Sequence, residues 1–322
     1  MRYLRPIPSS DGARLAGGWV RFDRIEVQAR GAAPKIVSLG DIGDQELAPL
    51  VAPRPNIAGI AMDRPSLMGI LNVTPDSFSD GGRHLAVDDA VAQADRMAAA
   101  DILDIGGEST RPGAPEIDPT KEAERVLPVI DALAGRRLSI DTRKAAVARR
   151  AIAAGAKLIN DVSGLQFDVE MTTVAVETDT PVCLMHSIGT PATMQDNPHY
   201  ADVVLDVYDA LAARIDRAVQ AGIARNRIIA DPGIGFGKTE AHNLTLLHHI
   251  GLFHGLGVPL LLGASRKGFI GRIGNAPNPD ARLPGTLAVT LAAVAQGVQM
   301  HRVHDVADVA QGLALWRAVT EG

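Results

Sequence analysis

Short apolar segments that end in a polar residue recur eight times along the chain, and most are followed by a segment with helical periodicity. Parallel strands that are buried on both faces have continuous apolar runs instead of an alternation of apolar and polar residues. Eight strand–helix repeats predict an α/β fold, a (β/α)8 TIM barrel over residues 64–322, with its active site at the carboxyl ends of the strands. The predicted strands are Leu67–Thr74, Asp101–Gly106, Arg137–Arg143, Lys157–Gly164, Pro181–Ser187, Arg227–Gly233, Pro259–Lys267 and Gln299–Asp305.

The segments between the predicted strands are rich in alanine and amphipathic. In Ala201–Gly222 the residues Val204, Tyr208, Leu211 and Ile215 follow helical spacing, and Gly222 is a typical helix stop. Three connections are long, and loops of this length in a compact domain are commonly lids or binding loops. They are Pro75–Ala86, Gly107–Thr120 and Gly268–Pro284.

Residues 1–63 differ from the rest. They contain prolines, several glycines and short strand-like runs at Trp19–Arg30 and Lys35–Ile42. We expect an N-terminal extension with a few short strands that packs on the bottom of the barrel and has no catalytic role.

Composition narrows the class of protein. Hydrophobic residues make up 46% of the 322 residues and charged residues 21%, which is ordinary for a globular protein. No apolar run reaches the roughly 18 residues of a membrane span, and the N-terminus lacks the apolar core of a signal peptide, so we expect a cytoplasmic protein without membrane contact. Cys183 is the only cysteine, which excludes an internal disulfide and a cysteine-based zinc site. The net charge of -5 and 3% aromatic residues argue against a nucleic-acid partner.

Three hydrogen-bond acceptors end the third, fourth and sixth predicted strands: Asp141, Asn160 and Asp231. Such groups are costly to bury without partners, and a ligand with a row of N–H donors, such as an amino-pyrimidine heterocycle, would satisfy them. Lys267, after the seventh strand, would find a ring nitrogen or carbonyl acceptor on the same ligand. The alternative is an internal salt-bridge network of these residues with Arg143 and Lys267.

Other strand-end residues suit an anion or a cation. Ser109, Thr110 and Arg111 offer two hydroxyls and a guanidinium, which fits phosphate oxygens, although a solvated loop is the alternative. Alternation along the last strand puts Arg302 and His304 on one side, where they could form an anion site. The amide oxygen of Asn72 suits a hard cation such as Mg²⁺, and a turn cap is the alternative.

Two further motifs are weaker. Gly233–Thr239 (GIGFGKT) resembles a phosphate-binding loop, but Pro232 stands where that loop requires its first glycine, and no G-x-G-x-x-G follows the first strand. A group of histidines falls in one predicted helical segment and is interpreted as partly exposed helix surface, with a metal site as the alternative: His242, His248, His249 and His254.

Taken in order, the motifs LNVTPDSFSDGG, GGESTRPGA, SIDTR, IND, DPGIGFGKT, SRKGFIG and RVHD resemble those of the dihydropteroate synthase family, from about Leu67 to the C-terminus. The resemblance implies a pterin-binding TIM barrel, a transferase that condenses 6-hydroxymethyl-7,8-dihydropterin pyrophosphate with p-aminobenzoate. The products are 7,8-dihydropteroate and pyrophosphate, a step of folate biosynthesis. It also implies a Mg²⁺ cofactor and a homodimer.

The resemblance assigns roles to residues of this chain. Pterin binding falls to Asp141, Asn160, Asp231 and Lys267, with Asp141, Asp231 and Lys267 as the catalytic residues. Ser109, Thr110 and Arg111 belong to a substrate-binding loop, and Arg302 with His304 holds the pyrophosphate. Asn72 contributes to the metal site, and Met185 and Phe236 line the pterin and p-aminobenzoate regions.

The chain departs from the family pattern at two places. Ser187 and Ile188 stand where many members carry an arginine, and Gly268 stands where many have serine. Two other functions stay open at this point. One is a methyl-transferring pterin barrel that acts on a folate, which needs no STRPG loop or pyrophosphate site. The other is a non-catalytic paralogue, in which loss of strand-end residues would be expected.

Overall fold

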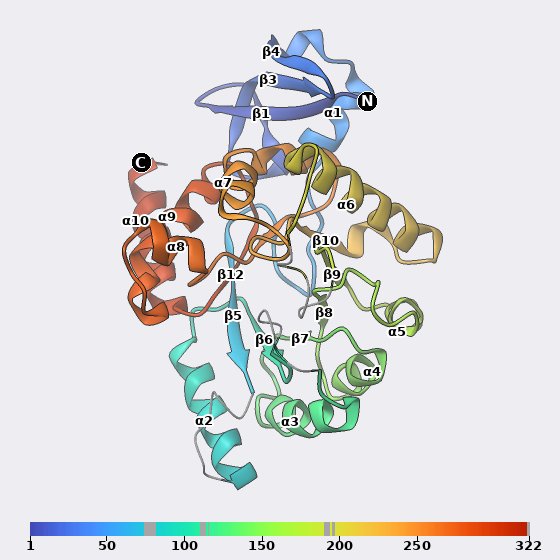
Figure 1. The fold of residues 1–322 in the computed structure, drawn as a ribbon, viewed down its shortest axis with the longest axis vertical. Helices are drawn as coiled ribbons and strands as arrows, with labels where there is room; N and C mark the ends of the chain where they lie inside the picture. The colour runs from blue at the N-terminus through green and yellow to red at the C-terminus, as the bar shows by residue number, and fades with distance from the viewer. Residues whose placement is uncertain (74–81, 110–113, 115, 190–193, 195–196, 321–322) are drawn as a thin grey trace.

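A computed structural model of the chain describes residues 1–73, 82–109, 114, 116–189, 194 and 197–320. Eight parallel strands form one sheet in the order β10-β9-β8-β7-β6-β5-β12-β11, and a bridge between Ala230 and Leu260 joins its two edges into a closed barrel. The predicted (β/α)8 barrel is therefore confirmed (Figure 1). Its strands are β5 (Ser66–Asn72), β6 (Ile102–Gly106), β7 (Leu138–Asp141), β8 (Leu158–Asp161), β9 (Val182–Met185), β10 (Ile228–Asp231), β11 (Leu261–Leu262) and β12 (Met300–Val303).

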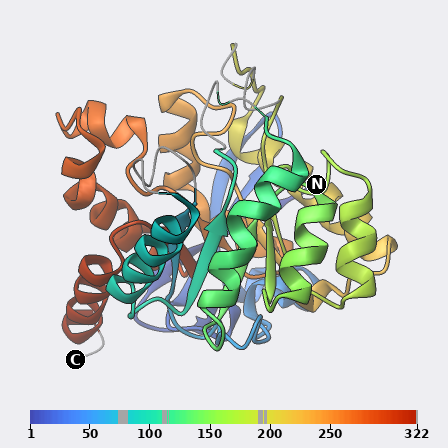
Figure 2. The same cartoon turned by 90° about the horizontal axis from the view of Figure 1, so that it is seen from below.

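Helices lie on the outside of the strands, and Figure 2 shows α2, α3 and α4 side by side. They are α2 (Gly82–Arg96), α3 (Pro119–Ala132), α4 (Ala145–Ala153), α5 (Glu170–Glu177), α6 (Val203–Gln220), α7 (Glu240–His248), α8 (Gly268–Ile273), α9 (Leu283–Val294) and α10 (Val306–Thr320), with short 3-10 turns η3 (Arg225–Arg227), η4 (Ile250–Leu256) and η5 (Pro279–Arg282). The outward side chains of the strands, such as Leu71, Ile105 and Ile140, pack against these helices in one large buried cluster.

The N-terminal boundary of helix α6 is set by a capping residue in the sequence. The predicted helix Ala201–Gly222 is observed as Val203–Gln220. Asp202 precedes it, and its carboxylate accepts hydrogen bonds from the backbone N–H groups of Val204 and Leu205 at 3.0 and 3.1 Å. This cap satisfies backbone donors that have no partner inside the helix.

One expected loop is partly helical. Gly268–Pro284 was predicted as a long loop, but its first six residues form α8, and η5 follows near its end. Gly268 and Gly271 suggested a loop, whereas Phe269 and Ile270, only 4% and 5% exposed, bury one side of a short helix against the barrel. The histidine group also differs from its prediction, because His254 is fully buried and its Nε2 donates to the Gln296 carbonyl at 3.0 Å.

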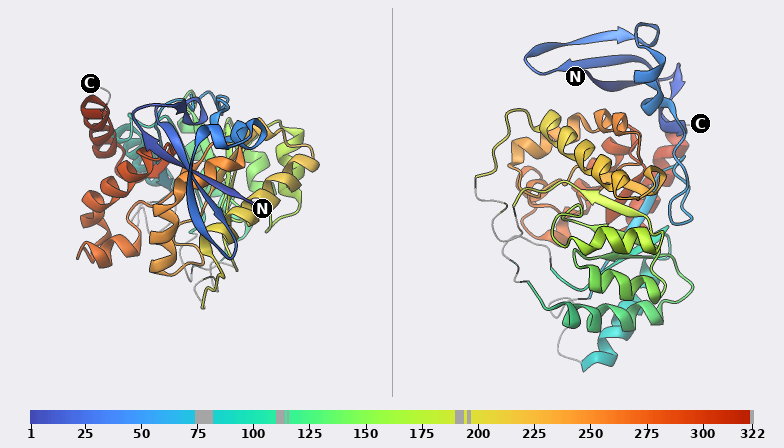
Figure 3. Two further views of the ribbon diagram at one scale, coloured as in Figure 1. Left: turned by 90° about the horizontal axis from the view of Figure 1, so that it is seen from above. Right: turned by 90° about the vertical axis from the view of Figure 1, so that its right-hand side faces the viewer.

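The N-terminal residues form a small antiparallel sheet with its own core. Its strands are β1 (Tyr3–Ser9), β2 (Ala13–Arg14), β3 (Arg21–Ala29) and β4 (Ala32–Ser38), and η1 (Leu15–Gly17), η2 (Leu39–Asp41) and α1 (Asp44–Val51) accompany them. The sheet lies on one side of the barrel (Figure 3). Contacts to α6 and η4 hold it there: the Tyr3 hydroxyl donates to Asp209 at 2.9 Å, and Arg54 donates to the His254 carbonyl at 2.9 Å.

The segment between this sheet and β5 closes the amino-terminal end of the barrel. Ile57, Ile60 and Met62 are at most 2% exposed and share one buried cluster with residues of seven barrel strands. Those strand residues are Met68, Ile102, Leu158, Cys183, Ile229, Leu261 and Met300. The barrel interior is therefore filled with apolar side chains at this end, and polar groups are left to the other end.

Candidate active site

Alternation along the barrel strands stacks an apolar layer and a polar layer inside the barrel. Side chains two positions apart on a strand point to the same face, so each inward residue at the closed end is followed by a second inward residue nearer the carboxyl end. The first of the two is apolar on the seven strands named above and is Ser139 on β7. On six strands the second residue is Asp104, Asp141, Asn160, Met185, Asp231 or Arg302, and all of these except Met185 are polar. We call this set the polar layer.

The centre of the polar layer is an ion-paired cluster. Nε of Arg302 donates to Oδ2 of Asp104 at 2.6 Å, and Nη2 donates to Oδ2 of Asp141 at 2.7 Å. Nδ2 of Asn160 donates to the same Asp104 oxygen at 2.8 Å. Residues from four strands, β6, β7, β8 and β12, thus meet at one point.

In this cluster one guanidinium, that of Arg302, faces two carboxyl groups, those of Asp104 and Asp141. Burial, opposed by Arg302 and reinforced by Asp104, raises the pKa of Asp141 to about 7. Burial opposes ionisation of Arg302 as well, but the neighbouring carboxylates raise its pKa above the usual value. Within the described residues, Oδ1 of Asp104 and Oδ1 of Asp141 are buried without a hydrogen-bond partner. The cluster therefore offers acceptor atoms that a ligand with N–H donors could satisfy.

Asp104 was missed by the sequence analysis, which considered only residues at strand ends. Asp104 lies in the middle of β6 and is fully buried. A signal was present: an aspartate two positions before Gly106 in an otherwise apolar strand faces the barrel interior.

Asp231 and Lys267 stand beside this cluster. Burial raises the pKa of Asp231 to about 6, against the hydrogen bond from the Gly233 backbone N–H at 2.7 Å and the charge of Lys267. A Cβ on Gly263 would lie 3.8 Å from Oδ2 of Asp231 and 4.0 Å from Cβ of Arg302, so the glycine leaves room between them. Burial and the charge of Arg302 lower the pKa of Lys267 to about 8.

Lys267 also contacts an aromatic ring. Its Nζ lies 4.1 Å from the centre of the Phe236 ring, and Gly235 passes so close that a Cβ there would be 3.1 Å from Cδ of Lys267. The Gly235 backbone is left-handed, with φ of 82°, which favours glycine. The segment that follows β10 therefore forms one wall beside the Lys267 ammonium group.

The lysine of the GIGFGKT motif explains why this segment only resembles a phosphate-binding loop. Lys238 is 3% exposed, and its Nζ donates to the carbonyls of Gly233 and Phe236 at 2.9 and 3.0 Å and contacts Nδ1 of His186 at 3.0 Å. Burial lowers the pKa of Lys238 to about 7. Lys238 thus holds the turn that carries Phe236, a role that the sequence analysis did not assign.

The remaining predicted site residues are placed as follows. Asn72 ends β5, and a Cβ on Gly106 would lie 3.5 Å from its Oδ1 and 3.6 Å from Oδ2 of Asp141. Met185 is 3% exposed and pairs in register with Asp231. Nδ1 of His304 lies 2.9 Å from Oγ of Ser265. Ser109 is partly buried after β6, whereas Thr110 and Arg111 lie outside the described residues.

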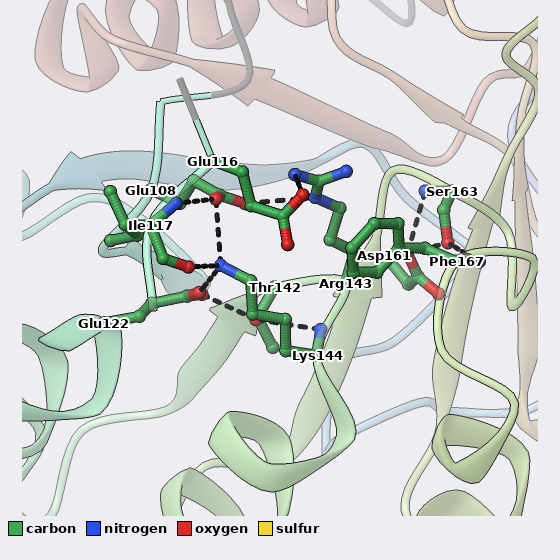
Figure 4. A network of polar contacts seen from close by, with 10 residues as sticks. All are labelled: Glu108, Glu116, Ile117, Glu122, Thr142, Arg143, Lys144, Asp161, Ser163 and Phe167. Carbon is green, nitrogen blue, oxygen red and sulfur yellow. Dashed lines mark hydrogen bonds and ion pairs between the residues drawn. The ribbon is translucent and has the colours of Figure 1, made fainter. Parts of the chain in front are cut away.

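A second buried network fixes the segment that follows β6 (Figure 4). Nζ of Lys144 donates to Glu108 at 2.8 Å, to Glu122 at 2.7 Å and to the Ile117 carbonyl at 2.7 Å. Arg143 pairs with Glu108 at 3.1 Å and covers the ring of Phe167 at 3.9 Å. The internal network weighed from sequence, with Arg143 and Lys267 against the strand-end carboxylates, is thus replaced: Arg302 pairs with Asp141, and Arg143 faces the β6–α3 connection.

The two departures from the family pattern have local partners. Ile188 packs on Gly237, where a Cβ would come within 2.3 Å of its Cγ1, so glycine at 237 makes room for this isoleucine. The Ser187 carbonyl accepts from Nη2 of Arg214 at 3.0 Å. Gly268 begins α8 directly after Lys267.

These features define a class of protein. A closed barrel whose carboxyl end carries buried carboxylates, an amide and two cations is a barrel enzyme that suits a donor-rich heterocycle. Residues 68–304 match the family of pterin binding enzymes. In the residues that the structure describes, no helix is long and apolar enough to cross a membrane.

Individual relatives agree. The chain is 46% identical over 262 residues to dihydropteroate synthase of Escherichia coli K12, a match that covers 80% of this chain and 92% of that protein. It is similar to the crystal structure of Xanthomonas albilineans dihydropteroate synthase with 4-aminobenzoic acid, with a TM-score of 0.78, 46% identity and 84% and 99% of the two chains covered. The same enzyme in complex with 7,8-dihydropteroate gives a TM-score of 0.76 at 43% identity, over 84% and 100% of the two chains. The chain belongs to the dihydropteroate synthase family and is a transferase, as its motifs predicted.

Proposed function

We propose that the polar layer binds the pterin ring of 6-hydroxymethyl-7,8-dihydropterin pyrophosphate and that p-aminobenzoate then displaces the pyrophosphate. The observation that carries this proposal is the meeting of Asp141, Asn160 and Asp231 beside Arg302 at one end of the barrel. Two carboxylates and an amide oxygen form an acceptor array that complements the amino and ring N–H donors of a pterin. Lys267 donates to an acceptor atom of the same ring.

Asp141, Asp231 and Lys267 act on the reacting ring. Cleavage of the carbon–oxygen bond at the pterin methylene leaves positive character on the pterin, and the carboxylates of Asp141 and Asp231 stabilise it in a site from which water is largely excluded. Three carboxylates, counting Asp104, face the two cations Arg302 and Lys267, so the excess charge is negative. The amine of p-aminobenzoate is already a nucleophile and needs no strong general base.

The leaving pyrophosphate is assigned to Arg302 and His304, and Ser109, Thr110 and Arg111 are assigned to substrate binding. Met185 lines the pterin region and Phe236 the p-aminobenzoate region. Because the guanidinium of Arg302 pairs with Asp104 and Asp141 of the polar layer, this residue would connect the proposed pterin site with the proposed pyrophosphate site.

A magnesium ion is proposed as the cofactor. Among the described residues, no cluster of three or more histidine, cysteine or acidic side chains could hold a metal ion. Mg²⁺ is commonly held by one or two protein oxygens together with substrate phosphates and water, which fits Asn72 Oδ1 near Asp141 Oδ2. When bound, Mg²⁺ would offset the negative charge of the pyrophosphate.

The direct test is synthesis. The chain is mixed with the pterin pyrophosphate, p-aminobenzoate and Mg²⁺, and dihydropteroate is measured by chromatography. We expect product only when all three are present, and chelation of Mg²⁺ to abolish it reversibly. Absence of product from folded protein would reject the proposal. We propose a dissociative path, in which the carbon–oxygen bond breaks before the amine attacks. A kinetic isotope effect at the pterin methylene tests it, and a value typical of a tight, associative displacement would contradict it.

We also propose a homodimer and a cytoplasmic location. Leu315 and Val319 on α10 are 67% and 77% exposed, which is unusual for large apolar residues and supports an interface there. The single cysteine is a buried thiol, as is ordinary in the cytoplasm. Light scattering should give twice the chain mass of 33.8 kDa for the wild type and the single mass for Leu315→Glu. A wild-type monomer would contradict the dimer.

A further inference from the structure

Asp104 is a buried carboxylate of the polar layer that has not been assigned a direct contact with either substrate. It is fully buried in the middle of β6, between Leu103 and Ile105, which face the outer helices. A buried charge is costly unless it is paired and hydrogen-bonded. Oδ2 of Asp104 accepts hydrogen bonds from two residues that are assigned to substrate binding, from Asn160 at 2.8 Å and from Arg302 at 2.6 Å.

We propose that Asp104 is a positioning residue, which orients the amide of Asn160 and holds the guanidinium of Arg302 off the free oxygen of Asp141. This inference deepens the proposed function and rests on it.

The orientation of Asn160 follows from the chemistry of its partner. A carboxylate can only accept, so the amide atom that faces Asp104 is the donor Nδ2. The acceptor Oδ1 is thereby left for the ligand. Without Asp104, the amide could turn over and present its N–H₂ group to the N–H donors of a pterin, which would convert an attraction into a repulsion.

The placement of Arg302 depends on two anchors. Nε and Nη2 form the edge of a guanidinium that one carboxylate often occupies alone, in a bidentate pair. Here the edge is shared, with one oxygen from Asp104 and one from Asp141. Loss of the Asp104 anchor would let Arg302 take both oxygens of Asp141. Oδ1 of Asp141, which has no partner in the described part of the chain, would then be lost to the substrate.

A pair of variants at one position separates this role from simple packing. In D104N the amide oxygen can take the place of Oδ2 and still accept from both Asn160 and Arg302, because a carbonyl oxygen has two lone pairs. In D104L, a side chain of similar size, no acceptor remains for either residue. Ser139→Ala is the matched control, because Ser139 is the register partner of Asp104, is equally buried and has no hydrogen-bond partner among the described residues.

The measurement is the affinity for 6-hydroxymethyl-7,8-dihydropterin pyrophosphate by calorimetry without p-aminobenzoate, together with KM and kcat and a thermal melt for each variant. We expect D104L to bind at least tenfold more weakly and its KM to rise in parallel. D104N should bind at least threefold more tightly than D104L, and S139A should stay within twofold of the wild type.

Three results would overturn the proposal: a D104L loss of less than fivefold, a D104N variant that binds no tighter than D104L, or S139A as impaired as D104L. Should D104L not fold, D104N decides alone: affinity within fivefold of the wild type supports a role that needs only the acceptor oxygen, and a larger loss overturns it. All comparisons are relative to the wild type, so a wild-type chain that binds no pterin would reject the proposed function instead.

Discussion

Nη2 of Arg302 lies 2.7 Å from Oδ2 of Asp141, so a cation expected at the anion-binding rim is anchored in the polar layer beneath it. Arg302 comes from the last strand of the barrel and Asp141 from the third, 161 residues apart in sequence. Their pairing means that the pterin region and the pyrophosphate region share a residue. Substitutions at either residue should therefore affect both regions and the stability of the fold.

Arg302→Ala should weaken pyrophosphate binding by about 100-fold or more and also destabilise the protein. Removing one partner of a buried ion pair costs about 3–5 kcal/mol, because the other charge is left uncompensated. The side chain of Arg302 is 20% exposed, which places the expected loss at about 3 kcal/mol at pH 8. The loss should be smaller at pH 5, because the pKa of Asp141 is raised to about 7 and its carboxyl group is then protonated and uncharged. Calorimetry with pyrophosphate and urea unfolding at both pH values check this, and unchanged pyrophosphate affinity would remove Arg302 from the anion site.

Asp141 should make the fold more stable as the pH falls from about 7 to about 4. Its pKa is about 7 in the folded state and 3.8 in the unfolded chain, so between these values the folded state binds more protons than the unfolded state. Linkage then requires the free energy of unfolding to decrease as the pH rises through this window. Asp141→Asn should remove this pH dependence, and activity should be lost because an acceptor becomes a donor toward the pterin. Urea unfolding at pH 5 and 8 measures it, with the exposed Asp216→Asn as the control, and an identical pH slope in D141N would contradict the prediction.

Asp231→Asn should lower kcat/KM by about 100-fold or more, because one acceptor becomes a donor opposite the donor edge of the pterin, which costs about 3 kcal/mol. The Gly233 N–H can still donate to the amide oxygen, so the turn after β10 should persist. Steady-state kinetics and pterin affinity are the readouts, with a thermal melt to show that the variant is folded. Near-wild-type turnover together with unchanged pterin affinity would reject the role of Asp231.

Lys144→Met should destabilise the protein by about 3–5 kcal/mol, because Glu122 and Glu108 lose a buried cationic partner. The double variant K144M/E122Q should recover at least 1 kcal/mol of that loss, since it also removes one stranded charge. Urea unfolding gives both values. Lys157→Met, at an exposed lysine, is the control, and a K144M variant as stable as this control would show that the network of Figure 4 contributes little.

The barrel could be predicted because its strands are apolar runs buried on both faces, which is a local property of the sequence. Asp141, Asn160 and Asp231 could be placed together because the carboxyl ends of parallel strands meet. Asp104 was missed because its importance comes from strand alternation, not from its place at a strand end. The contact between Lys144 and Glu108 could not be predicted, because the two residues lie 36 positions apart and no local pattern links them. The helix Gly268–Ile273 was not predicted because its glycines are more typical of a loop.

The segment that contains Ile57, Ile60 and Met62 is made before any of the barrel that it closes. During synthesis on the ribosome this segment would emerge first, and each later strand could pack its apolar residue against it. The apolar cluster is complete only when Met300 of the last strand has been added. A polypeptide that began at residue 64 would expose the apolar strand residues at this end of the barrel to water. We therefore expect the N-terminal residues to contribute to the folding and stability of the barrel.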